Sequence, residues 1–207
     1  MLSQVTAFAA IAVVKHFKGR INLILVNDLS LVENMRVYIP AVNTDNHAVY
    51  FEVQSFFSKG TGAVCVTGQV AENVRESVLV AWSMINHFYC NLGDKDIHVH
   101  FTEGSFCKEG TSCGLAIVIS LLDSLNILKN EHYKVLASGE IDLYGNIYQV
   151  GGVRGKTQNL GKNDFDLILF PEQNRGEAVD DSVPIKYLGK IEEFVREYSS
   201  EEINLLL

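Results

Sequence analysis

Two glycine-rich turns, each placed between a predicted strand and a predicted helix, constrain the fold of this chain most strongly. They are Lys108-Glu109-Gly110-Thr111-Ser112-Cys113-Gly114 and Gly151-Gly152-Val153-Arg154-Gly155-Lys156. Glycine allows backbone conformations that other residues rarely adopt, so such turns can present neighbouring side chains to a cleft. The groups that these turns offer are the hydroxyl of Ser112 and the amine of Lys156.

The composition is that of an ordinary globular protein. The 207 residues suffice for one substantial core with at most a small appendage, and 47% of them are apolar and 20% charged. A formal net charge of −8 argues against a nucleic-acid partner, which would require a basic face. The four cysteines, Cys65, Cys90, Cys107 and Cys113, lack zinc-type spacing and fit the cytoplasm or another reducing compartment. No cofactor is expected.

The chain is predicted to consist of an N-terminal extension of uncertain role, residues 1–33, and one domain, residues 34–207. The apolar run at 5–14 is too short to span a bilayer, and no basic residue precedes it as in a secretory signal. We therefore expect a buried strand or helix there and no membrane partner. The apolar tail at 203–207 either docks on a neighbour or frays.

Strand and helix patterns interleave without a strict β–α–β rhythm, which predicts an α+β (mixed α/β) fold around one core. Residues 48–54 and 62–67 predict two strands paired about a turn at 58–60. Residues 71–89 have the period of an amphipathic helix. Further strands are expected at 21–26, 96–101, 133–138, 146–150 and 166–170, and further helices at 112–128, 153–160 and 191–198.

Ser112 is a candidate nucleophile. The predicted helix begins at or near it, and the unpaired N–H groups of a helix start suit the oxyanion that forms when a carbonyl is attacked. Alternatively, Ser112 is only the N-cap of this helix, a role that serine often fills.

Lys156 is a candidate general base, because a neutral lysine can take the proton of a hydroxyl without any histidine. Its ordinary pKa of about 10.4 must first be lowered, and burial lowers it. Val150, Val153 and Leu160 could supply apolar surroundings, and Ser138 could aim the amine by a hydrogen bond. The alternative is a solvated helix residue, as most lysines are.

Two other patterns are weaker. Residues 151–157 nearly match a phosphate-binding loop, but Val150 stands where the first glycine belongs, so nucleotide binding is not expected. His98 and His100 share one face of a predicted strand, and no spacing suggests further metal ligands. They are interpreted as wall residues of the site or as core histidines, because nothing in the sequence places a histidine beside Ser112.

A set of short segments carries a family resemblance. They are Asp96-Ile97-His98-Val99-His100, Glu103-Gly104, Lys108 to Gly114, Ser138-Gly139-Glu140-Ile141, Gly151 to Lys156 and Leu169-Phe170-Pro171. In this order and spacing they resemble the proteolytic domain of Lon proteases over residues 36–200. The resemblance implies a Ser–Lys dyad of Ser112 and Lys156, with Ser138 at the place of the hydroxyl residue that supports the lysine. It also implies hexameric rings, hence a homo-oligomer, and cleavage of unfolded polypeptides.

The chain departs from the family around Ser112. Where Pro-Lys-Asp-Gly-Pro-Ser-Ala-Gly is usual, Cys107, Glu109, Thr111 and Cys113 replace proline, aspartate, proline and alanine. The lost proline frees a φ angle before Ser112. Glu109 takes the place of the aspartate and is counted, with Ser138, His98 and His100, among the supporting residues.

The resulting hypothesis is a serine endopeptidase that cleaves polypeptides through an acyl-enzyme. The family's ATPase module is not contained in these residues, so a separate ATPase is a possible partner. Two alternatives stay open: a catalytically silent scaffold or peptide-binding ring subunit, and a self-processing protease of the viral Ser–Lys type.

Overall fold

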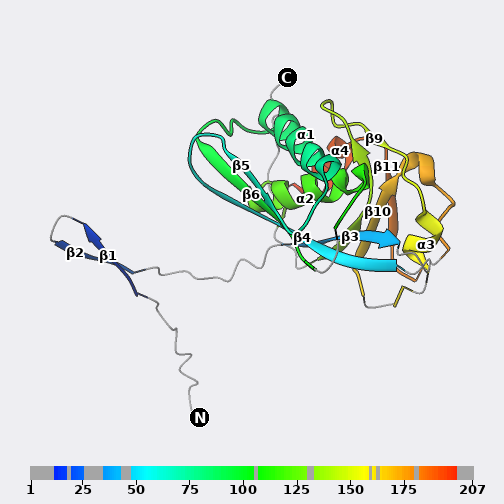
Figure 1. Ribbon diagram of the computed structural model, residues 1–207, viewed down its shortest axis with the longest axis horizontal. Coiled ribbons are helices and arrows are strands. Elements are labelled where there is room, and N and C mark those ends of the chain that lie inside the picture. The colour runs from blue at the N-terminus through cyan, green and yellow to red at the C-terminus, as the bar shows by residue number, and fades with distance from the viewer. Residues whose placement is uncertain are drawn as a thin grey trace, which may run out of the picture. The chain divides into compact units, whose positions relative to one another are not determined.

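The computed structural model describes residues 12–17, 20–25, 35–42, 48–104, 107–129, 133–158, 160–161, 164–179 and 182–199 (Figure 1). The chain forms two compact units, 1–33 and 34–207. In the first unit, β1 (Ala12–Phe17) pairs with β2 (Arg20–Leu25) in an antiparallel hairpin, so the strand expected at 21–26 is confirmed. Residues 5–11 of the apolar run and the tail at 203–207 lie outside the described residues.

A seven-stranded mixed sheet organises the second unit, in the order β11-β10-β7-β3-β4-β6-β5. The long strand β4 is antiparallel to both of its neighbours, whereas all other adjacent strands are parallel. This sheet with its helices confirms the α+β (mixed α/β) fold class. The strands are β3 (Arg36–Val42), β4 (Ala48–Lys59), β5 (Val64–Thr67), β6 (Lys95–Phe101), β7 (Lys134–Ala137), β10 (Leu167–Pro171) and β11 (Ile185–Leu188).

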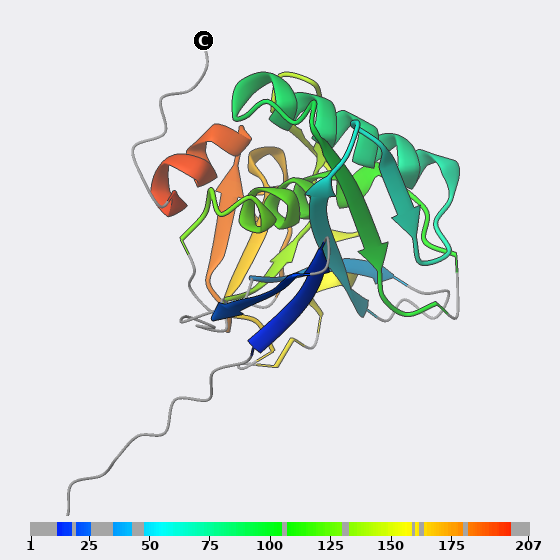
Figure 2. The ribbon, with the colours of Figure 1, turned by 90° about the vertical axis from the view of Figure 1, so that its left-hand side faces the viewer.

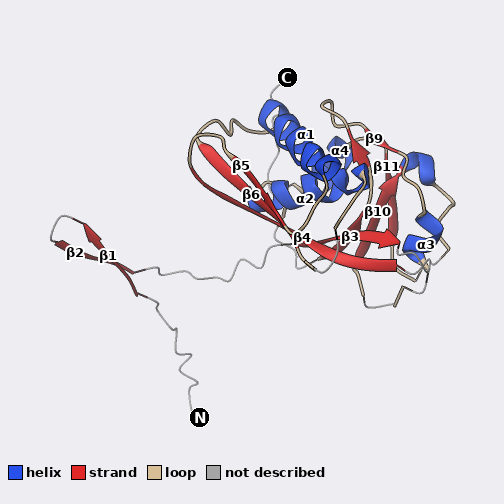
Figure 3. Cartoon of the chain, in the orientation of Figure 1, coloured by secondary structure: helices blue, strands red, loops and turns tan. Residues whose placement is uncertain are grey.

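The helices lie on both faces of the sheet (Figures 2 and 3). Three of them, α1 (Glu72–Phe88), α2 (Gly114–Ser124) and α4 (Ile191–Tyr198), pack on one face, and the short α3 (Val153–Thr157) packs against β3 and β4 on the other. Among the described residues, none of the helices has the length and apolar character needed to cross a membrane. Shorter elements are β8 (Glu140–Ile141), β9 (Ile147–Tyr148) and the 3₁₀ turns η1 (Thr111–Cys113) and η2 (Glu172–Asn174).

The sheet divides the buried apolar side chains into two clusters, where the sequence led us to expect one core. The larger cluster lies under α1, α2 and α4 and includes Phe101 and Phe194. The smaller one lies on the face of α3 and includes Val153, Phe165 and Phe170. Because successive residues of a strand point to opposite faces, a sheet covered on both sides necessarily separates its core in this way.

The expected helix at 71–89 is confirmed by α1, whose buried face includes Val74, Val78, Ala81 and Ile85. The other expected helices are also found, but α2 and α3 are shorter than predicted. The sequence patterns did not identify β3 or β11. β3 contains a proline, which is rare in a central strand, and only Leu188 of the four residues of β11 is buried.

The predicted pairing of residues 48–54 with residues 62–67 is wrong. β6 lies between β4 and β5, antiparallel to the first and parallel to the second. Its pairing with β4 runs from Val53–Phe101 to Lys59–Lys95, which is longer than its pairing with β5. A short connection suggests a hairpin, but here β6, which arrives after α1, takes the inner position and leaves β5 at the sheet edge.

Gly68, directly after β5, allows a close backbone contact. Its φ of +108° lies in the left-handed region, and a Cβ added there would lie 2.0 Å from the carbonyl oxygen of Phe101. We expect Gly68→Ala to lower the free energy of unfolding by at least about 2 kcal/mol. Gly104→Ala is the matched control, because no atom lies within 4 Å of the added Cβ, and it should change stability by less than about 0.5 kcal/mol. Urea titrations that give equal losses for both variants would contradict this account.

Candidate active site

Ser112 lies in a 3₁₀ turn that leads directly into α2. The turn follows Gly110, whose φ of +97° favours glycine. Neither η1 nor α2 has a side-chain hydrogen bond at its N-cap, and the N-cap positions are Gly110 and Cys113. The structure therefore does not support the alternative in which Ser112 is the N-cap, and the half-buried Ser112 side chain lines a cavity instead.

Lys156 lies in α3, which begins after Gly152 with its left-handed φ of +72°. The side chain is buried, with an exposed fraction of 6%. Its Nζ donates a hydrogen bond to Ser138 Oγ at 3.1 Å. Lys156 is therefore not the solvated helix residue of the alternative interpretation. It is not placed like a phosphate-binding lysine either, because such a lysine would face an open loop.

Ser138 connects the two candidate residues. It lies between β7 and β8 and is 1% exposed. Its hydroxyl accepts from Lys156 Nζ and donates to the main-chain oxygen of Ser112 at 3.3 Å. The N–H of Gly139 donates to the same oxygen at 2.8 Å. The segment after β7 thus holds both the backbone of Ser112 and the amine of Lys156.

Ser112 and Lys156 line the same cavity, which has a volume of about 240 Å³. Its apolar wall comes mainly from β3 and β4, and Val74 and Phe101 complete it. Val150, Val153 and Leu160, which the sequence suggested as apolar surroundings of Lys156, belong to the smaller apolar cluster and do not line this cavity. The lining residues are Ile39, Pro40, Ala41, Val42, Phe51, Val74, Phe101, Lys108, Glu109, Gly110, Ser112, Cys113, Gly151, Gly152 and Lys156.

Burial lowers the pKa of Lys156 to about 8, and the neighbouring Cys113 opposes this shift only in its thiolate form. Desolvation disfavours the charged ammonium more than the neutral amine. Near pH 8 a substantial fraction of the amine is therefore unprotonated and able to accept a proton.

Cys113 adjoins Ser112 in sequence but is buried, with an exposed fraction of 4%. Burial raises the pKa of its thiol to about 11. The thiol also donates to the main-chain oxygen of Gly110 at 3.5 Å. Since the thiolate is the reactive form of cysteine, this environment makes Cys113 a poor nucleophile at neutral pH.

Glu109 and the two histidines lie in different places. The exposed Glu109 lines the cavity of Ser112 and Lys156. The structure does not bring His98 and His100 there. Phe101 lines the cavity, and on β6 the two histidines lie on the other face of the strand, where both contact Thr67 Oγ1 at 2.9 and 2.8 Å. His98 is exposed, so it is not a core histidine either. Within the described ranges, no group of three or more histidine, cysteine or acidic residues is placed to hold a metal ion.

Three residues that support the site were not identified from the sequence. Lys108 is buried in the cavity wall, and its Nζ donates to the main-chain oxygens of Gly68, at 2.9 Å, and Glu103. Tyr50 donates to the main-chain oxygen of Lys156 at 3.2 Å. Asn174 holds Val150, just before the second glycine-rich turn, by two hydrogen bonds of 3.0 and 2.9 Å. These contacts join segments that are distant in the sequence, so no local sequence pattern predicts them.

The sequence is matched by a family of known proteins. The model of the family described as Lon protease (S16) C-terminal proteolytic domain matches residues 42–206. The chain belongs to the Lon protease family. A Lon protease of Clostridium acetobutylicum is 31% identical over 75% of this chain, and one of Methylocella silvestris is 33% identical over 68%. The peroxisomal Lon protease homolog 2 of Caenorhabditis elegans is 33% identical over 60%.

These relatives are much longer proteins. The match covers 20% of the Clostridium Lon protease, 18% of the Methylocella protein and 17% of the Caenorhabditis protein. The chain therefore spans about a fifth of the length of the curated relatives, and the shared part is the Lon proteolytic domain. The expectation that the chain resembles this domain is confirmed.

The low pKa of Lys156 predicts how stability depends on pH. The unfolded chain binds this proton up to about pH 10.5 and the folded chain only up to about pH 8, so stability rises with pH between these values. At about 1.36 kcal/mol per pKa unit, the free energy of unfolding of the wild type should rise over this pH range by about 3 kcal/mol more than that of a Lys156→Met variant. Urea titrations of both proteins at pH 7.5 and 10.5 measure it. An equal response of the two proteins to pH would contradict the burial of the amine.

Proposed function

We propose that this Lon-type domain is a serine endopeptidase that uses Ser112 as nucleophile and Lys156 as general base. The observation that carries the proposal is a buried lysine amine, with a lowered pKa, in the same cavity as a serine at the start of a helix. Membership of the Lon protease family supports the same chemistry. A scaffold without activity would not need a desolvated lysine, because burying it lowers the stability of the fold.

The proposed reaction has two stages. The neutral Nζ of Lys156 takes the proton of the Ser112 hydroxyl while Oγ attacks the carbonyl carbon of the scissile bond. The tetrahedral intermediate then collapses, the C–N bond breaks, and the ammonium of Lys156 gives its proton to the leaving amine. In the second stage Lys156 takes a proton from water, whose oxygen attacks the acyl-enzyme carbonyl. The ester C–O bond to Ser112 Oγ then breaks, the acid leaves, and the ammonium of Lys156 returns its proton to Oγ.

Ser138 and the turn around Ser112 supply the positioning. The Ser138 hydroxyl holds the amine of Lys156 at 3.1 Å and can keep its lone pair aimed at the cavity. Main-chain N–H groups at the beginning of η1 and α2 are the groups that would stabilise the oxyanion, since the first amides of a helix carry partial positive charge. An extended polypeptide substrate would pair with a strand edge beside the cavity.

The assembly and partners belong to the same proposal. By likeness to the Lon family we propose a homo-oligomeric ring, a hexamer, that receives unfolded polypeptides in the cytoplasm or another reducing compartment. An ATPase, in the same polypeptide or in a separate one, would unfold folded substrates and deliver them to the ring. Short peptides should need no such help, because they require no unfolding before they reach the cavity.

Replacing either proposed catalytic residue should remove activity. Ser112→Ala leaves no attacking oxygen and Lys156→Ala leaves no base, so each should lower kcat/KM on a fluorogenic peptide by at least about 10³-fold. Ser58→Ala and Lys59→Ala, exposed at the end of β4, are matched controls and should keep full activity. Cys113→Ala should also remain active. If Ser112→Ala kept its activity while Cys113→Ala lost it, the thiol would be the nucleophile.

The pH dependence of the reaction should follow Lys156. Only the neutral amine accepts a proton, so kcat/KM should rise with pH through about 8 and then level off. Steady-state rates on a short peptide between pH 6 and 10 measure this profile. A rate that peaks near pH 6 and falls above it would assign the base to another group.

A further inference from the structure

A second cavity, of about 200 Å³, lies at the other end of α2 from Ser112 and shares no lining residue with the first. It forms where β3 and β4 separate. Their pairing ends at Val37 and Val53, and beyond it the N–H of Met35 donates to Asp123 Oδ2 of α2 at 2.9 Å. The cavity is lined by Met35, Arg36, Glu52, Val53, Gln54, Ser55, Ser120, Asp123 and Ser124.

Asp123 is the unusual residue of this cavity. Its exposed fraction is 2%, and within the described residues its buried Oδ1 has no hydrogen-bond partner. Burying an ionised carboxylate without a partner for one oxygen is strongly unfavourable, so such a group calls for an explanation. Burial also raises the pKa of Asp123 to about 6, a shift that the bond from Met35 only partly offsets. At neutral pH the carboxylate is therefore charged and incompletely compensated.

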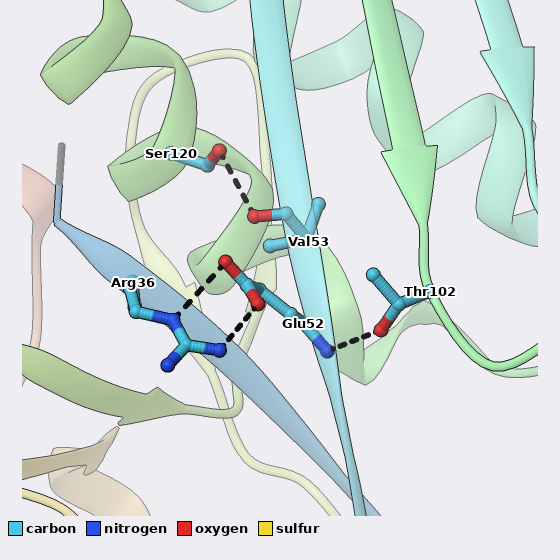
Figure 4. Close-up of polar contacts among 5 residues, drawn as sticks. All are labelled: Arg36, Glu52, Val53, Thr102 and Ser120. Carbon is cyan, nitrogen blue, oxygen red and sulfur yellow. Dashed lines mark hydrogen bonds and ion pairs between the residues drawn. The ribbon is translucent and has the colours of Figure 1, made fainter. Parts of the chain in front are cut away.

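The other charges of the cavity cancel each other. Arg36 donates to both carboxylate oxygens of Glu52, through Nη2 at 2.9 Å and Nε at 3.5 Å (Figure 4). This bidentate ion pair fixes the Glu52 side chain and compensates its negative charge. Among the charged residues that line the cavity, Asp123 is thus left as one uncompensated negative charge.

Three serine hydroxyls add hydrogen-bond acceptors. Ser55 Oγ lies 2.7 Å from the main-chain oxygen of Ser120, Ser120 Oγ lies 3.3 Å from that of Val53, as drawn in Figure 4, and Ser124 Oγ lies 2.9 Å from that of Ser55. The hydroxyls also contact one another, at 2.9 and 2.6 Å. Each hydroxyl proton has an acceptor inside this cluster, so a ligand would meet oxygen lone pairs.

We propose that this cavity binds a primary ammonium group carried on a short alkyl chain, with Asp123 as its counter-ion and the three serine hydroxyls as further acceptors. An ammonium matches the site in three ways. It carries one positive charge, it has three N–H donors and no acceptor, and its alkyl chain fills a space much larger than the roughly 30 Å³ of one water molecule.

A metal ion fits this cavity less well. Hard divalent cations take six or more oxygen ligands and favour several carboxylates. Here Glu52 is already engaged by Arg36, and the described residues gather no set of three metal-ligating side chains. Calcium binding is therefore an outcome that the experiment must separate from ammonium binding.

Isothermal titration calorimetry of the full chain with n-butylammonium chloride at pH 7.5 tests the proposal. We expect saturable binding at one site, and no binding of 1-butanol, which lacks the charge, or of tetramethylammonium, which lacks the N–H donors. Asp123→Asn should weaken binding at least tenfold, since it removes the charge but keeps an oxygen for Met35. Asp94→Asn, at an exposed aspartate, should leave the affinity unchanged.

A second readout does not depend on how well Asp123→Asn folds. The Met35 N–H is bonded to the Asp123 carboxylate, so its NMR resonance in the wild-type chain should shift with n-butylammonium and saturate at the same concentration. Ser124→Ala, which removes one acceptor, should weaken binding severalfold. The affinity should also rise as pH increases through about 6, because ionised Asp123 is required.

Comparison of two further probes identifies the source of the ammonium. Nα-acetyl-lysine methylamide represents a lysine side chain of a polypeptide, and putrescine represents a free amine, so preferred binding of one assigns the natural ligand. The proposal is overturned if n-butylammonium shows no saturable binding, if calcium binds in its place, or if Asp123→Asn binds as tightly as the wild type. None of these measurements uses peptide cleavage, so they remain informative even if the peptidase proposal fails.

Discussion

The hydrogen bonds of Ser138 hold the candidate site together. One hydroxyl accepts from the buried amine of Lys156 and donates to the main chain of Ser112, so two segments that are distant in sequence meet at one atom. This arrangement requires a desolvated amine, and β3 and β4 provide most of the apolar wall of the cavity. The free energy lost by desolvating Lys156 is small beside the free energy gained by burying the two apolar clusters, so the fold can keep this lysine buried.

Helix α2 relates the two cavities of the domain. Its first turn follows Ser112, and its last turns carry Ser120, Asp123 and Ser124 of the second cavity. The helix is buried along almost its whole length, so polar side chains on it need partners from the strands. Ser120 and Ser124 find them on β4, whereas the Asp123 side chain has one partner among the described residues, the N–H of Met35. The same helix thus carries the Ser112 turn at one end and an incompletely compensated carboxylate at the other.

Much of the fold could be predicted from the sequence, because it depends on local patterns. The periodicity around Val78 marks α1, and the alternation from Ile97 to Phe101 marks β6. The strand order could not be predicted. The strand that takes the inner position is selected by the length of its pairing with β4 and by the helix packed above it. The same alternation predicts that His98 and His100 share a face, but not that this face lies away from the cavity.

The sequence by itself determined the family, the fold class and the two turns that carry Ser112 and Lys156, because short motifs and hydrophobic periodicity are properties of neighbouring residues. Only the tertiary structure decided that Lys156 is buried, that Ser138 bridges it to the Ser112 turn, and that Asp123 Oδ1 has no hydrogen-bond partner in the described part of the chain. The physical reason is the same in each case. Desolvation and hydrogen bonding depend on what packs around a group, and the packing partners come from remote parts of the chain.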